Sequence, residues 1–169
     1  MKIVLRDGAV AATHHESQDL SAVPEYRDCL ILTVPDGTLV EIGQPWDVDL
    51  DAAKASVNNA IDAEAERRRN AVLTPGAGQM AAYQEKERQA RALLADDTPT
   101  EAEYPDIYNE IGLTADSAGE VAMAVLAAAE RWRAYGRQVE RARLAGKKAV
   151  AAAGDVAAIL AARHAVPWP

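Results

Sequence analysis

The sequence predicts an α+β protein, in which a small N-terminal antiparallel β unit precedes an Ala-rich helical hairpin or three-helix bundle with a long last helix. Residues 1–50 contain four of the 37 Ala and 15 of the 34 Val, Ile and Leu, whereas residues 51–169 contain the other 33 Ala. Ala favours helices, and β-branched residues favour strands. A 4–3 spacing of apolar residues predicts the long helix. We therefore expect a β-rich domain over residues 1–48 and an α-helical domain over residues 49–169.

The composition argues against three classes of protein. Of the 169 residues, 49 % are apolar, which is too many for a disordered chain. No stretch approaches 18 uncharged apolar residues, so we expect no insertion into a membrane. Arg6 and Asp7 interrupt the apolar stretch that a signal peptide would need.

The β unit begins with a predicted hairpin. Lys2–Leu5 has the apolar character of a strand, Arg6-Asp7-Gly8 is typical of a turn, and Ala9–Ala12 returns as a second strand. The polar residues between His14 and Val23 predict a loop.

A second hairpin is predicted after that loop. Tyr26–Val34 is the strongest strand pattern in the chain, and Pro35-Asp36-Gly37 predicts a turn because Pro presets φ and Gly accepts a positive one. Thr38–Ile42 is then expected to pair back. A sheet of about four short strands is marginal alone, so we expect it to pack on a helix, a neighbouring subunit or a larger partner.

Capping and breaking residues predict the helices. Asp49 or Asp51 starts the first helix, and Ser117 with Glu120 forms a capping box for the third. Gly154-Asp155 separates a short final helix from it. The predicted helical ranges are 49–73, 78–95, a short helix near 105–111, 116–153 and a short helix after 155, with 165–169 as a non-helical tail.

The third helix carries apolar residues at alternating spacings of four and three, which is a heptad pattern. The row consists of Val121, Val125, Ala128, Trp132, Tyr135, Val139 and Ala142, and Ala149 would continue it past a skipped position at Gly146. Residues 116–153 would form a helix about 57 Å long. Two interpretations stay open: a three-helix antiparallel bundle within one chain, and a self-associating coiled coil.

The residues that could carry chemistry are few. His14-His15-Glu16 has no second cluster of His or Cys to complete a metal site, and adjacent side chains on an extended segment point apart. Thr74–Gly78 lacks the Lys-Ser/Thr of a phosphate loop, so we expect an interhelical turn. We expect no catalytic residues, metal, cofactor or small-molecule substrate. The third helix is rich in Arg and Lys, but the chain's net charge of −8 argues against nucleic-acid binding.

Two stretches resemble small bacteriophage tail proteins, known as tail fibre or tail fibre assembly proteins. The first is Val34–Asp47, with its Val-Pro-Asp turn, Ile-Gly, an aromatic residue and an acidic end, although Gly43-Gln44-Pro45-Trp46 replaces the usual Gly-Trp. The second is Ala63–Leu94, in which a Tyr-x-x-Lys helix follows a Pro-Gly turn. The resemblance continues through Tyr104-Pro105 and the Ala-rich helix that contains Trp132.

This resemblance implies a non-enzymatic tail structural protein, an adaptor or fibre-associated module at the tail tip or baseplate, which is made in the host cytoplasm and resides in the virion tail. The alternative is a tail fibre assembly chaperone that is absent from the mature virion. The implied partners are other tail or tail fibre proteins, or further copies of the chain. Buried aromatic residues dominate interface energies, which makes four side chains candidate partner-binding residues, with core packing as the alternative role: Trp46, Trp132, Tyr135 and Trp168.

Overall fold

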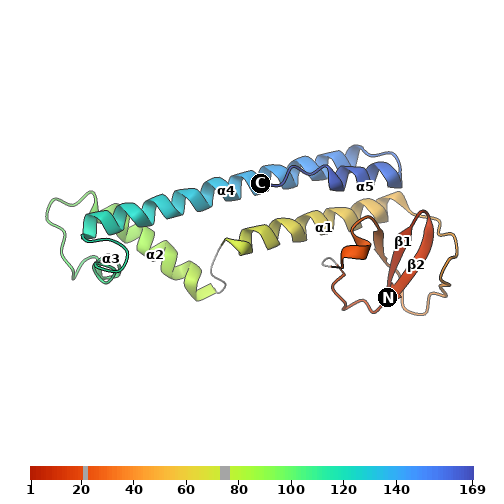
Figure 1. Ribbon diagram of the computed structural model, residues 1–169, viewed down its shortest axis with the longest axis horizontal. Coiled ribbons are helices and arrows are strands. Elements are labelled where there is room, and N and C mark those ends of the chain that lie inside the picture. Colours follow the sequence, from red (N-terminus) through yellow and green to blue (C-terminus); the bar gives the residue numbers. More distant parts are fainter. Residues whose placement is uncertain (21–22, 73–76) are drawn as a thin grey trace. The chain divides into compact units, whose positions relative to one another are not determined.

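A computed structural model describes residues 1–20, 23–72 and 77–169, and the side chains of residues 77 and 78 are not described. A three-stranded antiparallel sheet at the N-terminus is followed by helices, one of them 35 residues long (Figure 1). The predicted α+β class is therefore confirmed. None of the helices in these ranges has the length and hydropathy that a membrane span requires.

The sheet has the strand order β2-β1-β3. β1 (Lys2–Arg6) pairs antiparallel with both β2 (Ala9–His14) and β3 (Leu30–Thr33). Asp7 and Gly8 connect β1 to β2 with φ values of 51° and 79°, which suit a two-residue hairpin loop. The first predicted hairpin is confirmed.

The prediction of a strand at Thr38–Ile42 is wrong, because this segment forms a loop. A fourth strand after the Pro35–Gly37 turn would need the outer edge of β3. At that edge Ser56 Oγ, from the following helix, donates a hydrogen bond to the Ile31 carbonyl. The chain instead crosses to the opposite edge of the sheet, where the Gly43 amide donates to the Val10 carbonyl (2.7 Å).

The strand predicted over Tyr26–Val34 is shorter in the structure. Pro24 begins a 3-10 helix, η1 (Pro24–Tyr26), and a turn follows in which the Cys29 amide donates to the Tyr26 carbonyl (3.1 Å). Pro at the first position favours a helical turn because its φ is already helical. Only Leu30–Thr33 of this segment form the strand β3.

The predicted caps start the helices. Asp49 accepts hydrogen bonds from the Asp51 and Ala52 amides at 3.2 and 3.3 Å, and Ser117 Oγ accepts one from the Glu120 amide at 3.3 Å. Asp155 Oδ1 accepts one from the Ala158 amide at 2.7 Å. The helices are α1 (Leu50–Ala71), α2 (Ala77–Leu93), α3 (Pro105–Tyr108), α4 (Ala118–Ala152) and α5 (Val156–His164).

The chain forms two compact units that divide it differently from the expected boundary at residue 48. The sheet unit comprises Met1–Arg67 and Val139–Pro169, and the hairpin unit comprises Arg68–Gln138. The sheet is grouped with helices because one of its faces packs on them. This core contains Ile3 and Leu5 of β1, with further members Val57, Ile61, Ala142, Val150, Ile159 and Val166.

The second face of the sheet is also covered. Val4 of β1 packs with Leu20 and Cys29, all of them buried. β1 is thus apolar on both faces, and the small sheet is stabilised by the chain's own helices and loops.

The hairpin unit has a separate small core where α2, α3 and the start of α4 meet. Its buried residues are Ala90, Leu93, Ile107, Val121 and Ala122. The buried Gln89 joins two of the elements, because its Oε1 accepts a hydrogen bond from the Asp106 amide at 3.0 Å in the first turn of α3.

The 4–3 row along α4 is buried at its ends and exposed in between. Val121, Val139 and Ala142 are buried, whereas Ala128 and Trp132 are exposed. The expected continuation at Ala149 is wrong: Ala149 is exposed, and Gly146 and Val150 are the buried positions. A straight helix drifts by about 20° per heptad relative to a 3.5-residue repeat, so the buried face moves on by one residue.

Candidate partner-binding groove

The hairpin unit contains a groove between two of its helices. α2 and the start of α4 lie side by side near α3 and diverge toward the first residues of α2 (Figure 1). The core around Val121 fills the closed end, and a cavity of about 730 Å³ occupies the open end. The lining comprises Val72, Met80, Tyr83, Gln84, Lys86, Glu87, Glu110, Thr114, Ala124, Val125, Ala128, Ala129, Arg131, Trp132 and Arg133.

The lining of the groove combines small residues of α4 with one aromatic residue from each of α2 and α4. Ala124 and Ala128 of α4 leave space that a larger side chain would fill. Trp132 is 37 % exposed and Tyr83 is 40 % exposed. Large apolar side chains exposed together around a hollow are typical of a protein-binding surface.

The charged side chains of the groove are largely paired within the chain. Lys86 forms an ion pair with Glu110, and Arg133 forms one with Glu87. Hydrogen bonds from Arg133, and then from Arg91 at 2.7 Å, lower the pKa of Glu87 below its usual value. The hydrogen bond from Lys86 likewise lowers the pKa of Glu110. Both carboxylates therefore favour the ionised form, and Glu87 links α2 to α4 through Arg133.

The structure places the four predicted partner-binding residues in different surroundings. Trp132 lines the groove, and Tyr135 lies half-buried on the same helix outside the lining. Trp46 and Trp168 are half-buried against the core of the sheet unit. The structure therefore brings only Trp132 into the groove.

Sequence reasoning missed the contribution of α2 to this site. Met80, Tyr83 and Glu87 follow one another at spacings of three and four residues, which places them on one helical face. That spacing could have identified the face, although not the groove, because the groove depends on where α4 lies.

The sheet unit exposes a second apolar surface, the loop surface, formed by Leu39 and Ile42. Leu39 is 93 % exposed and Ile42 is 64 % exposed. The loop that carries them is anchored where the Val10 amide donates to the Gln44 carbonyl and the Trp46 amide to the Gly8 carbonyl, both at 2.9 Å. Fixed backbone beneath exposed apolar side chains lowers the entropy cost of binding a partner.

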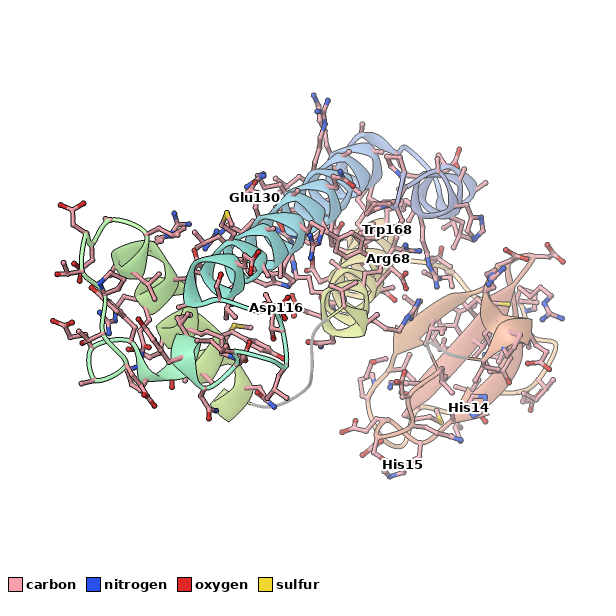
Figure 2. All side chains as sticks on the ribbon, turned by 60° about the vertical axis from the view of Figure 1, so that its left-hand side comes forward. His14, His15, Arg68, Asp116, Glu130 and Trp168 are labelled. Carbon is pink, nitrogen blue, oxygen red and sulfur yellow. The ribbon has the colours of Figure 1, made fainter. Side chains whose placement is uncertain are left out.

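The two adjacent histidines make local contacts near the end of β2 (Figure 2). His14 Nε2 lies 2.9 Å from the Tyr26 hydroxyl, and the two rings meet edge to face with centroids 5.3 Å apart. His15 Nδ1 lies 2.7 Å from Ser17 Oγ. Within the described ranges, no group of three or more His, Cys, Asp or Glu side chains is arranged to hold a metal ion.

The turn expected at Thr74–Gly78 falls mostly outside the described residues. Thr74, Pro75 and Gly76 are not described, and Ala77 and Gly78 belong to the first turn of α2.

Much of the basic character of α4 is compensated by carboxylates. Arg143 and Lys147 contact the two oxygens of Asp62 in α1 at 2.7 and 2.8 Å. Arg137 contacts Glu130 at 2.7 Å. These cations stabilise contacts within the chain.

The chain was compared with known proteins at three levels, by family, by sequence and by structure. No protein-family model, no curated protein and no solved structure matches it.

Proposed function

We propose that this protein is a non-enzymatic structural component of a bacteriophage tail, which acts as an adaptor or fibre-associated module at the tail tip or baseplate. The phage setting rests on the resemblance of Val34–Asp47 and Ala63–Leu94 to small tail proteins. The role as an adaptor rests on one structural observation, that each compact unit exposes an apolar surface on an ordered frame.

The loop surface lies within the first of these two stretches. Leu39 and Ile42 extend into solvent from a loop whose Val40 and Trp46 pack against the core of the sheet unit. The loop presents these two aliphatic side chains to solvent at its surface. Aliphatic side chains on an anchored loop suit insertion into a pocket of another tail protein.

Mass spectrometry of purified phage particles tests the proposal. We expect peptides of this chain in mature particles at a fixed ratio to the other tail proteins. Their absence would overturn the proposal. If fibre protein then proved insoluble alone and soluble when co-expressed with this chain, the function would be that of a tail fibre assembly chaperone.

A pair of variants tests whether the loop surface mediates incorporation. Leu39→Ser combined with Ile42→Ser should reduce the amount of the chain in particles at least about tenfold, because interface anchors contribute about 2 kcal/mol or more. Leu144→Ser is the matched control, because Leu144 is also exposed in the sheet unit but lies on α4. Equal incorporation of both variants would exclude the loop surface as the attachment site.

A further inference from the structure

The exposed middle of the 4–3 row on α4 coincides with the groove of the hairpin unit. Val121 at the start of the row packs in the core of this unit, against residues of α2 and α3. The groove therefore continues the packed face of α4 beyond the point where the chain's own residues cover it. Ala128 and Trp132, the next positions that line the groove beyond the half-buried Val125, are exposed. A helix packed here would extend the row of side-chain contacts past Val125.

One face of this stretch of α4 carries two small side chains, Ala124 and Ala128, next to the large side chain of Trp132. Ala124, Ala128 and Trp132 are spaced four residues apart and all line the groove. If two α4 helices run antiparallel about a two-fold axis near residue 130, residue 132 of one copy lies opposite residue 128 of the other. Each Trp132 then fills the space above Ala128 of the second copy. In a two-fold interface the same surface patch of both copies is in contact, so the patch must be complementary to itself.

The charges of the groove permit such self-association. The pairs Lys86–Glu110 and Glu87–Arg133 neutralise most of the charge on the lining, although the chain as a whole carries −8. Arg131 is the lining cation that has no ion-pair partner in the described ranges. Its long side chain can reach solvent at the rim. Two copies of this surface therefore meet with little net repulsion.

We propose that the groove binds a second copy of this chain, so that the protein forms an antiparallel dimer through α4, with Trp132 of each copy packed against Ala124 and Ala128 of the other. This interface does not depend on a phage setting. A monomeric chain could still be a tail component, and a dimeric chain could serve elsewhere.

Sedimentation equilibrium of the full chain over a range of concentrations tests the dimer. We expect a mass of about twice 18.1 kDa at the higher concentrations. Ala128→Glu should weaken association at least about 100-fold, because it places a carboxylate in the apolar interface. The matched control is Ala127→Glu, the same change at an exposed neighbour of Ala128 that does not line the groove, and it should change the dissociation constant less than about threefold.

A second pair of variants tests the role of Trp132 without adding a charge. Trp132→Ala should weaken the dimer about tenfold or more, whereas Met123→Ala, at an exposed position of α4 outside the lining, should leave association unchanged. Circular dichroism should show the same helix content in all four variants. A chain that remains monomeric, or a dimer that withstands both Ala128→Glu and Trp132→Ala, would overturn the proposal.

Discussion

Gly146 of α4 lies against Val166 in the C-terminal tail. A Cβ atom at this position would lie 2.6 Å from Val166 Cγ2 and 3.3 Å from Ile61 Cδ1. The first distance is shorter than any van der Waals contact, so only glycine leaves room for the buried Val166. The absence of a side chain at Gly146 thus allows Val166, in the tail that follows α5, to pack in the core of the sheet unit.

We expect Gly146→Ala to lower the free energy of unfolding by about 1–2 kcal/mol, as overpacking of a well-packed interior does. Gly136→Ala, on the same helix, is the control: a Cβ atom there meets nothing within 4 Å, so the gain in helix propensity should raise the free energy of unfolding by up to about 1 kcal/mol. Urea denaturation measures both. Adding Val166→Ala should remove most of the cost of Gly146→Ala, and equal stabilisation by the two Gly→Ala changes would contradict the contact.

At the scale of elements, the sequence predicts helices better than strands, because helix ends depend on neighbouring residues. Asp49 and Ser117 each cap the helix that follows them, as expected. Asp155, where a new helix was expected to begin, caps α5. The failed strand at Thr38–Ile42 depended on a partner edge. The hydrogen bond from Ser56 to the Ile31 carbonyl spans 25 residues, and no local pattern predicts it.

The cap of α5 can be tested directly. Asp155→Ala removes the acceptor for the Ala158 amide, which should lower the free energy of unfolding by about 1 kcal/mol. Asp155→Asn keeps a capping oxygen and should remain within a few tenths of a kcal/mol of the parent chain. The thermal unfolding midpoints of the two variants provide the comparison, and equal midpoints would show that this cap contributes nothing.

The contact between α1 and α4 within the sheet unit should depend on pH. Hydrogen bonds from Lys147 and then Arg143 lower the pKa of Asp62 below its usual value of 3.8, although burial acts in the opposite direction. A carboxyl whose pKa is lower in the folded than in the unfolded chain stabilises the fold fully when the pH is above its pKa in the unfolded chain. This contribution is lost as the pH falls through its pKa in the folded chain. We therefore expect the urea concentration at the unfolding midpoint of the parent chain to decrease as the pH is lowered past about 4. The midpoint of Asp62→Asn should decrease less steeply over the same pH range.

The control for this pH dependence is Asp47→Asn. Asp47 is exposed in the same unit and has no ion pair within the described ranges. This variant should follow the parent chain at every pH. Identical slopes for the parent chain and Asp62→Asn would contradict the role of the ion pairs.

For the whole molecule, the sequence predicts the class of fold but not the grouping of its parts. The sheet unit joins the first 67 residues to residues 139–169, because α1, the end of α4 and α5 cover one face of the sheet. A boundary drawn from composition cannot detect a core shared by segments so distant in sequence.

The candidate site was predictable in part. Trp132 could be selected because it is a large side chain in an apolar row, but its neighbours Tyr83 and Ala124 reach the groove through the packing of α2 on α4. Trp46 and Trp168 have the same side chain, but they pack against the core of the sheet unit. Residue type alone therefore cannot separate an anchor for a partner from a core residue.

The central claim is that this chain is a structural component that binds its partners through apolar surfaces. Because we propose a bacteriophage tail as its setting, cryo-electron microscopy of assembled phage tails that contain this chain tests that claim most directly. We predict density for the chain in a fixed number of copies, with Leu39 and Ile42 seated against a neighbouring tail protein. A tail complete without this chain, or one in which both the loop surface and the groove face solvent, would contradict it.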